Sequence, residues 1–120
     1  MKRLMLIACL AATAPALAAT PEALDGPWSV DLSTDPAEPY AKTMLLLLAP
    51  DGSVSGSFYD SAIEAGRWKQ DRGRLCVSFR TTDGVGPYHS SACLRGDRVE
   101  GQTWAEHRNF LFNWNATRAP

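Results

Sequence analysis

The sequence predicts an all-β protein, and within that class a small antiparallel up-and-down barrel of about eight strands. Short segments in which apolar and polar residues alternate fill the chain after residue 25, and this is the pattern of a sheet with one buried face. All nine glycines fall in the same region and separate these segments with turns. Two cysteines also lie where they would pair across one predicted hairpin. A two-sheet β-sandwich is the alternative that the same pattern allows.

Residues 1–18 are predicted to be a signal peptide. Met1-Lys2-Arg3 supplies a positive start, residues 4–14 are an apolar stretch, and Ala16-Leu17-Ala18 has the small-x-small pattern of a cleavage site. We expect cleavage after Ala18, with Ala19 as the neighbouring alternative. Residues 19–25 are then an N-terminal leader, and residues 26–120 form a single β-barrel domain.

Removal of the signal peptide changes the charge and cysteine counts. The remaining 102 residues (120 less 18) carry 10 basic and 13 acidic side chains, a net charge of −3, and an even pair of cysteines. That balance excludes a nucleic-acid binder held by phosphate contacts. No apolar run approaches the ~20 residues needed to span a bilayer, so no transmembrane segment is expected in the mature chain. These features predict a periplasmic or secreted bacterial protein.

The first three strands are predicted from alternation and turn residues. Residues 28–32 alternate strictly, and a Pro-rich connection follows at residues 34–41. Residues 42–49 are a continuous apolar run that periodicity alone allows as helix or strand, and the turn Pro50-Asp51-Gly52 at its end favours a strand. Residues 53–59 alternate again.

The second half of the chain supplies five more strands. Residues 62–70 are predicted as a strand, although residues 61–65 could instead begin a helical turn that Gly66 would end. Clear alternation then marks the last four strands, at residues 75–80, 88–94, 99–104 and 110–115.

The register of one hairpin follows from its cysteines. Facing positions in an antiparallel pair have a constant sum, so a Cys76–Cys93 pair places Thr82 opposite Pro87 around the turn residues 83–86. A slip of one residue would break the turn, the apolar pairing and the cysteine match together. The expected pairs on the two faces are Leu75–Leu94, Val77–Ala92 and Phe79–Ser90, then Ser78–Ser91 and Arg80–His89. We therefore predict a Cys76–Cys93 disulfide, formed in an oxidising compartment.

Two strand-borne glycines support closure of the sheet. Val54-Ser55-Gly56 and Val99-Glu100-Gly101 both place a glycine two residues after a valine near the start of a strand. Glycine inside a strand marks a sharp bend or a close approach of another group. Such bends suit a small closed barrel.

Two short motifs carry a resemblance to known barrels. Gly26-Pro27-Trp28 is similar to the Gly-x-Trp that opens the calycin-type barrels, the lipocalin and avidin group, and residues 51–58 resemble an avidin-like hairpin. The chain is also similar to short exported bacterial proteins of unknown function. The resemblance implies an up-and-down barrel with a ligand-binding interior. It does not imply biotin binding, because avidins have Tyr in place of Phe58, and Asn and Ser in place of Asp31 and Ser33.

Catalytic and metal chemistry find little support in the residue pattern. The chain has two histidines, His89 and His107, whereas a structural zinc site needs about four ligands at recognisable spacing. His89 and Ser90 are adjacent on a predicted strand and therefore point to opposite faces, so the histidine cannot activate that serine. We expect a protein that is not an enzyme and has no metal or cofactor.

The four tryptophans bear on binding. Trp28 and Trp114 lie on regular apolar faces and are expected in the core. Trp104 shares its face with polar residues, so either it is an exposed binding aromatic or a bend at Gly101 turns it inward.

These observations predict a non-enzymatic exported binding protein, a lipocalin-like barrel for a small amphipathic ligand. The residues expected at its mouth are Tyr59, Glu64, Arg67, His89, Trp104 and His107. The alternative is a protein-interaction module, such as an inhibitor of a secreted or periplasmic hydrolase, whose partner would be an envelope protein. A filled interior would favour this alternative, and the inward residues Phe58, Phe79, Phe110, Phe112 and Trp114 leave little room.

Overall fold

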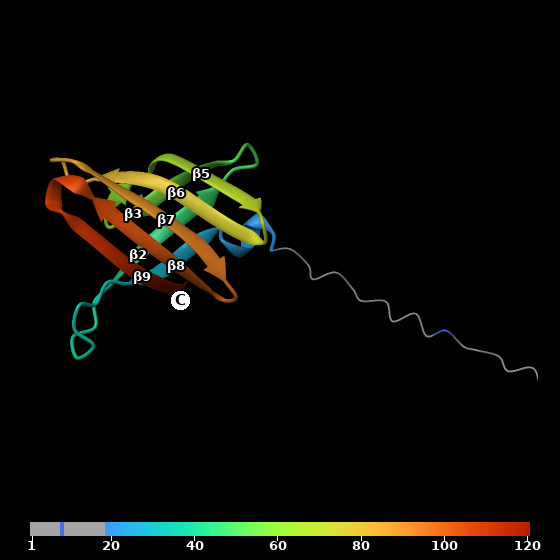
Figure 1. Cartoon of the computed structure of the whole chain (residues 1–120), viewed down its shortest axis with the longest axis horizontal. Helices are drawn as coiled ribbons and strands as arrows, with labels where there is room; N and C mark the ends of the chain where they lie inside the picture. The colour runs from blue at the N-terminus through green and yellow to red at the C-terminus, as the bar shows by residue number, and fades with distance from the viewer. Residues whose placement is uncertain (1–7, 9–18) are drawn as a thin grey trace, which may run out of the picture.

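The computed structural model describes residue 8 and residues 19–120, and the predicted signal peptide and cleavage motif lie, but for residue 8, outside the described residues. Nearly all of the regular secondary structure in the described chain is strand, and eight antiparallel strands close into a barrel (Figure 1). The strands are β1 (Gly26–Asp31), β2 (Ala41–Leu48), β3 (Ser53–Phe58), the two-residue β4 (Ser61–Ala62), β5 (Glu64–Asp71), β6 (Arg74–Thr82), β7 (Pro87–Arg95), β8 (Arg98–Ala105) and β9 (Phe110–Arg118).

The barrel has the predicted up-and-down topology. Apart from β4, which extends the sheet beside β3, each strand pairs with its neighbours along the chain. The ring is closed by β1 and β9, whose register places Trp28 opposite Arg118. This closure excludes the alternative of an open two-sheet sandwich.

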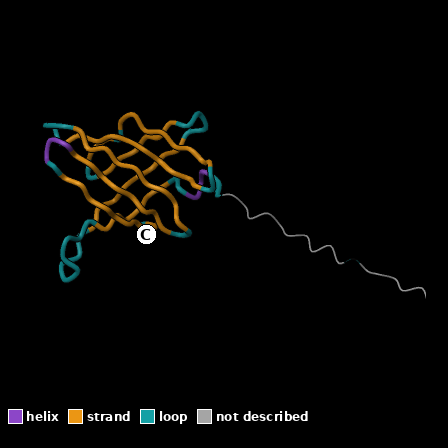
Figure 2. Tube along the Cα trace, viewed as in Figure 1, coloured by secondary structure: helices purple, strands orange, loops and turns teal. Residues whose placement is uncertain are grey.

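The two ends of the barrel differ. The short turns after β2, β5 and β7 share one end with the 3₁₀ helix η1 (Pro21–Ala23), and we call it the closed end. The opposite end, the open end, carries the β1–β2, β3–β5 and β6–β7 connections and the 3₁₀ helix η2 (Glu106–Arg108). Figure 2 shows the two helices at opposite ends, and the β1–β2 connection extends away from the barrel in Figure 1.

The core fills the closed end and the middle of the barrel. Alternate residues of each strand point inward, as period-two patterning requires, and the strands bury mostly aliphatic residues there. The buried cluster consists of Leu24, Trp28, Val30, Met44, Leu46, Val54, Phe58, Leu75, Val77, Phe79, Ala92, Val99, Trp114 and Ala116.

The segment expected to be a leader packs against the closed end. Leu24 is fully buried, and its carbonyl accepts a hydrogen bond of 2.9 Å from the Trp28 indole. The guanidinium of Arg118 lies 4.2 Å from the centre of the Trp28 ring, a cation–π contact, and donates hydrogen bonds to the carbonyls of Asp25 and Ala23. Residues at both ends of the described domain therefore close this end of the barrel.

The two strand glycines stand where other groups approach closely, as predicted. A Cβ on Gly56, which has a φ of +122°, would lie 1.9 Å from the carbonyl oxygen of Leu45 on β2. A Cβ on Gly101 would lie 2.3 Å from the indole of Trp114 on β9. Gly101 thus makes room for the largest side chain in the middle of the barrel.

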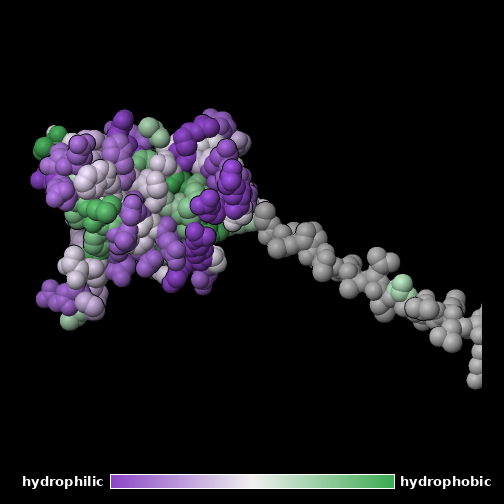
Figure 3. Space-filling model, viewed as in Figure 1, coloured by the Kyte–Doolittle hydropathy of each residue, from purple (hydrophilic) through white to green (hydrophobic). Residues whose placement is uncertain are grey.

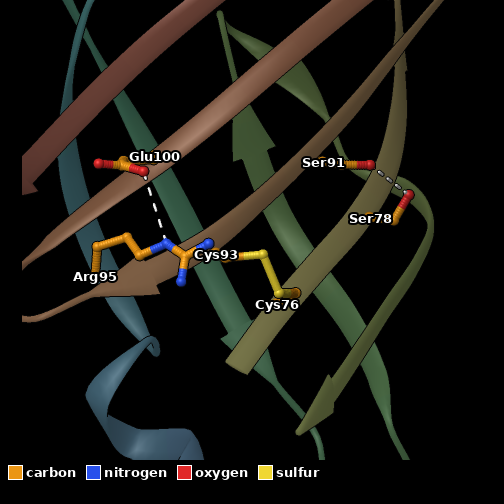
Figure 4. The surroundings of a disulfide bond; sticks show 6 residues. All are labelled: Cys76, Ser78, Ser91, Cys93, Arg95 and Glu100. Carbon is orange, nitrogen blue, oxygen red and sulfur yellow. Dashed lines mark hydrogen bonds and ion pairs between the residues drawn. A yellow bond between two sulfur atoms is a disulfide. The ribbon is translucent and has the colours of Figure 1, made fainter. Parts of the chain in front are cut away.

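The β6–β7 hairpin has the predicted register, from Cys76 opposite Cys93 to Thr82 opposite Pro87. The two cysteines form a disulfide on the outer face of the sheet (Figure 4). Two residues further along, the Ser91 hydroxyl donates a hydrogen bond of 3.2 Å to Ser78 across the same pair of strands.

Residues 62–70 fall in β4 and β5, with Ile63 between the two strands, which confirms the strand prediction over the helical turn. Its pairing is irregular, because the register between β5 and β6 shifts between Glu64 and Arg67, and Ala65 has a φ of +52°. Within the ranges that the structure describes, no helix has both the length and the apolar character needed to cross a membrane.

Candidate functional site

A cavity of about 610 Å³ occupies the open end of the barrel, above the packed core. Its size falls within the range of roughly 300–1,000 Å³ that is typical of small-molecule sites. Six strands, three connections and η2 contribute its lining, which consists of Leu32, Thr34, Tyr40, Phe58, Tyr59, Ser61, Thr81, Thr82, Asp83, Tyr88, Thr103, Arg108, Phe110, Phe112 and Trp114. The interior of the barrel is therefore hollow at this end, although the inward aromatic residues had predicted a nearly filled one.

One wall of the cavity is an aromatic ladder on β9. Phe110, Phe112 and Trp114 are successive inward positions, so they line the cavity from the rim to the core. The rings of Phe110 and Phe112 are stacked, with centroids 5.7 Å apart and an interplanar angle of 5°. Phe58 extends the aromatic surface across the floor, 5.4 Å from Trp114. The ladder offers an apolar body a long flat surface.

The buried polar groups of the floor are bonded to one another. The Trp114 indole donates a hydrogen bond of 2.9 Å to the Thr103 hydroxyl, and the hydroxyls of Thr103 and Ser90 lie 2.8 Å apart. Ser90 is almost completely buried. Since these groups satisfy one another, the floor can accept apolar atoms without leaving a hydrogen bond unmade.

The rim is organised by Asp83 in the β6–β7 loop. One carboxylate oxygen of Asp83 accepts hydrogen bonds from the backbone N–H groups of Val85 and Gly86, at 2.8 and 2.9 Å. These bonds fix the turn that the sequence Asp-Gly-Val-Gly predicts. They also hold the loop so that the second carboxylate oxygen faces η2.

That second oxygen joins the two loops across the rim. It accepts hydrogen bonds from His107 Nε2 at 3.0 Å, Arg108 Nε at 2.8 Å and the Tyr88 hydroxyl at 3.1 Å. The bond from His107 and the two backbone N–H groups hold the pKa of Asp83 far below its usual range, and Arg108 lowers it further. Burial and the bond to Asp83 raise the pKa of Tyr88. Asp83 is therefore an ionised anchor for the rim.

A second polar cluster borders the cavity beside β2. The Tyr40 hydroxyl donates a hydrogen bond of 3.2 Å to the Tyr59 hydroxyl, and this bond raises the pKa of Tyr40. Lys42 forms a 2.8 Å ion pair with Asp60, which raises the pKa of Lys42, and its ammonium lies 5.5 Å from the centre of the Tyr59 ring. Tyr59 and Asp60 have positive φ values of 52° and 60°, which turn the chain sharply after β3.

Exposed apolar side chains gather around this end. Among residues 19–120, seven large hydrophobic side chains have high exposure, and all of them except Leu47 lie on the connections or strand ends of the open end. The six are Tyr40, Tyr59, Val85, Trp104, Phe110 and Leu111. In Figure 3, hydrophobic surface interrupts the hydrophilic face toward this end, on the left of the view, and also near the middle of the domain. A ligand entering the cavity therefore passes a partly apolar rim.

The six residues predicted for the mouth do not form one site. Tyr59 lines the cavity. His107 lies at the rim but, together with His89 and Trp104, lines a separate depression on the outside of the barrel. His89 and Trp104 face each other on the outer surfaces of β7 and β8, and Trp104 is 39% exposed. Trp104 is therefore exposed and not turned inward by a bend at Gly101, and its role in binding stays a prediction.

The other two predicted residues lie away from the cavity. Glu64 is on the outer face, where its carboxylate accepts a hydrogen bond of 3.3 Å from Arg80. Arg67 reaches the turn at the closed end and donates a 3.5 Å hydrogen bond to the carbonyl of Asp51.

The rim residues that were not predicted for the mouth include three that meet at one point: Asp83, Tyr88 and Arg108. The sequence contains a signal for one of them, because Tyr88 shares its strand parity with the inward residues Ser90 and Ala92. The other two lie on loops, for which alternation gives no direction.

Comparison of the chain with family models, curated proteins and solved structures finds no match. Within residue 8 and residues 19–120, no group of three or more His, Cys, Asp or Glu side chains is placed to hold a metal ion.

Proposed function

We propose that this chain is a non-enzymatic binding protein that takes a small amphipathic ligand into the open end of its barrel. The observation that carries the proposal is the cavity of about 610 Å³, which is closed below by the core and walled by the β9 aromatic ladder. Hydroxyl groups from Tyr40, Tyr59 and Tyr88 ring the same cavity near its rim. An apolar body would occupy the interior, and a polar group would remain at the rim.

The state of Asp83 supports binding over turnover. It is the one carboxylate among the described residues that line the cavity. Its low pKa keeps it ionised, and five donors occupy its two oxygens. A general acid or base needs a pKa near the working pH and a free lone pair or proton. Asp83 has neither property and serves to hold the two loops together.

The proposed location is outside the cytoplasm. The Cys76–Cys93 disulfide supports it, because structural disulfides persist mainly in oxidising compartments. We propose a periplasmic or secreted bacterial protein that resembles the calycin-type barrels in architecture.

The test uses the neutral fluorescent probe N-phenylnaphthylamine and two matched variants of the chain. Thr81 is buried and lines the cavity, whereas Thr43 is exposed on the outer face of β2. The wild type and Thr43→Phe should bind the probe saturably, with a rise in its emission. Thr81→Phe fills part of the cavity and should weaken binding by at least about tenfold, roughly 1.4 kcal/mol.

Thermal unfolding followed by circular dichroism establishes that both variants are folded. If the folded wild type does not bind the probe, or if both variants bind it equally, the cavity is not the binding site. Those results would favour the protein-interaction module instead.

A further inference from the structure

Arg108 is the one positively charged side chain among the described residues that line the cavity. It leaves η2 next to the aromatic ladder, two residues before Phe110, and is 51% exposed. Its Nε donates to Asp83 at 2.8 Å, which fixes the plane of the guanidinium at the rim. A guanidinium carries five N–H donors in a rigid fork, so its two terminal nitrogens retain donors beyond this bond.

Asp83, unlike Arg108, has no hydrogen-bonding position left for a ligand. A carboxylate has about four lone-pair positions, and Asp83 already accepts from two backbone N–H groups, His107, Arg108 and Tyr88. A cationic or donor group on a ligand therefore finds no open acceptor there.

The neighbouring ion pair does not change this balance. Lys42 and Asp60 neutralise each other at 2.8 Å, and neither lines the cavity. Arg108 and Asp83 likewise form an ion pair at 2.8 Å, so these groups give the rim no net charge. What Arg108 offers a ligand is the unused N–H donors of its guanidinium, at the edge of an apolar aromatic interior.

We propose that the ligand is an amphipathic organic acid. Its apolar body lies along Phe110, Phe112 and Trp114, and its carboxylate accepts hydrogen bonds from the terminal nitrogens of Arg108. Arginine suits this task because its fork matches the two oxygens of a carboxylate. This inference rests on the proposed function, since it names the class of ligand for the same cavity.

The test compares two competitors of equal shape and different charge. Naphthaleneacetic acid and naphthaleneacetamide each displace N-phenylnaphthylamine from the wild type, and the ratio of their inhibition constants measures the preference for the acid at neutral pH. We expect a preference of about tenfold, the size of one partly exposed charge-assisted contact. Raised salt should reduce this preference and leave the affinity for the amide unchanged.

The variants are Arg108→Gln and the control Arg80→Gln. Arg80 lies on the outer face of β6 and pairs with Glu64, away from the cavity. Arg108→Gln should abolish the preference while the amide binds as before, and Arg80→Gln should keep it. Arg108→Lys retains the charge without the fork and should show an intermediate preference.

Three other outcomes would overturn the acid class of the ligand, the role of Arg108 or the proposed function. Equal affinity for acid and amide in the wild type overturns the acid class but leaves the cavity as a binding site. A preference that survives in Arg108→Gln, including an equal loss of affinity for both competitors, overturns the role of Arg108. Absence of binding by the neutral probe itself overturns the proposed function.

Discussion

Removal of the Cys76–Cys93 disulfide should cost a large part of the stability of this domain. The two cysteines are 17 positions apart, so the bond closes a loop of about 18 residues. The chain-entropy relation gives about 11 cal/mol/K for such a loop, or about 3 kcal/mol at 25 °C. Both cysteines are only half-buried on the outer face, so Cys76→Ser/Cys93→Ser removes the cross-link without opening a cavity in the core. The calculated value therefore represents the cross-link alone.

Equilibrium unfolding in urea measures this loss. With a slope of about 1.5 kcal/mol per molar urea, the midpoint should fall by about 2 M. The matched control is Ser78→Ala/Ser91→Ala, which removes a cross-strand contact on the same face of the same hairpin without removing a covalent bond. This control should lose less than about 1 kcal/mol, as expected for an exposed hydrogen bond.

Two results would refute the reasoning. One is a double serine variant that unfolds within about 1 kcal/mol of the oxidised wild type, because the loop-closure contribution would then be absent. The other is a Ser78→Ala/Ser91→Ala control that loses as much free energy of unfolding as Cys76→Ser/Cys93→Ser, since non-covalent contacts on this face of the hairpin would then matter as much as the cross-link.

Three further changes test the rim, the closed end and the middle of the barrel. Asp83→Asn should lower Tm at pH 7. Because folding lowers the pKa of Asp83, the ionised carboxylate stabilises the folded state at pH values above its unfolded pKa of about 4. This stabilisation is lost as the pH falls toward the pKa of the folded state. The gap in Tm between variant and wild type should thus narrow in scans at progressively lower pH, and a constant gap would contradict this account. Leu24→Ala should cost about 3 kcal/mol in urea unfolding, because Leu24 is fully buried, and a cost under about 1 kcal/mol would show that the packing of Leu24 at the closed end is dispensable. Gly101→Ala should displace the Trp114 indole, seen as changed tryptophan emission together with weaker probe binding, and unchanged emission would contradict the close approach.

The fold was accessible from the sequence because its signals are local and agree with one another. Period-two alternation identifies the strands, turn residues separate them, and the facing cysteines fix the register of one hairpin. Barrel closure followed from the strand glycines, whose positions reflect close contact with Leu45 and Trp114. Each of these features depends on a few neighbouring residues.

The binding site was harder to predict from the sequence, because strand parity identifies the residues that point inward but does not show which of them pack in the core and which line a cavity. Phe110 and Phe112 point inward as expected, yet they line a cavity. Glu64 and Arg67 both lie outside because the register shift between them breaks the alternation that parity assumes. Asp83 and Arg108 are 25 positions apart and meet only because two loops reach the same rim.

The barrel can close only when both β1 and β9 are present, because these two strands pair with each other. Trp28 meets Arg118 across 90 positions, so the first strand has no partner on that side until the last one has been synthesised. Non-local pairing of this kind is slow, because the chain loses conformational entropy when its distant segments come together, before any stabilising contact between them has formed. A chain cut short before β9 would expose two unpaired sheet edges, which favour aggregation. Loss of β9 is therefore predicted to be more damaging to the fold than an insertion of equal length in the long β1–β2 connection.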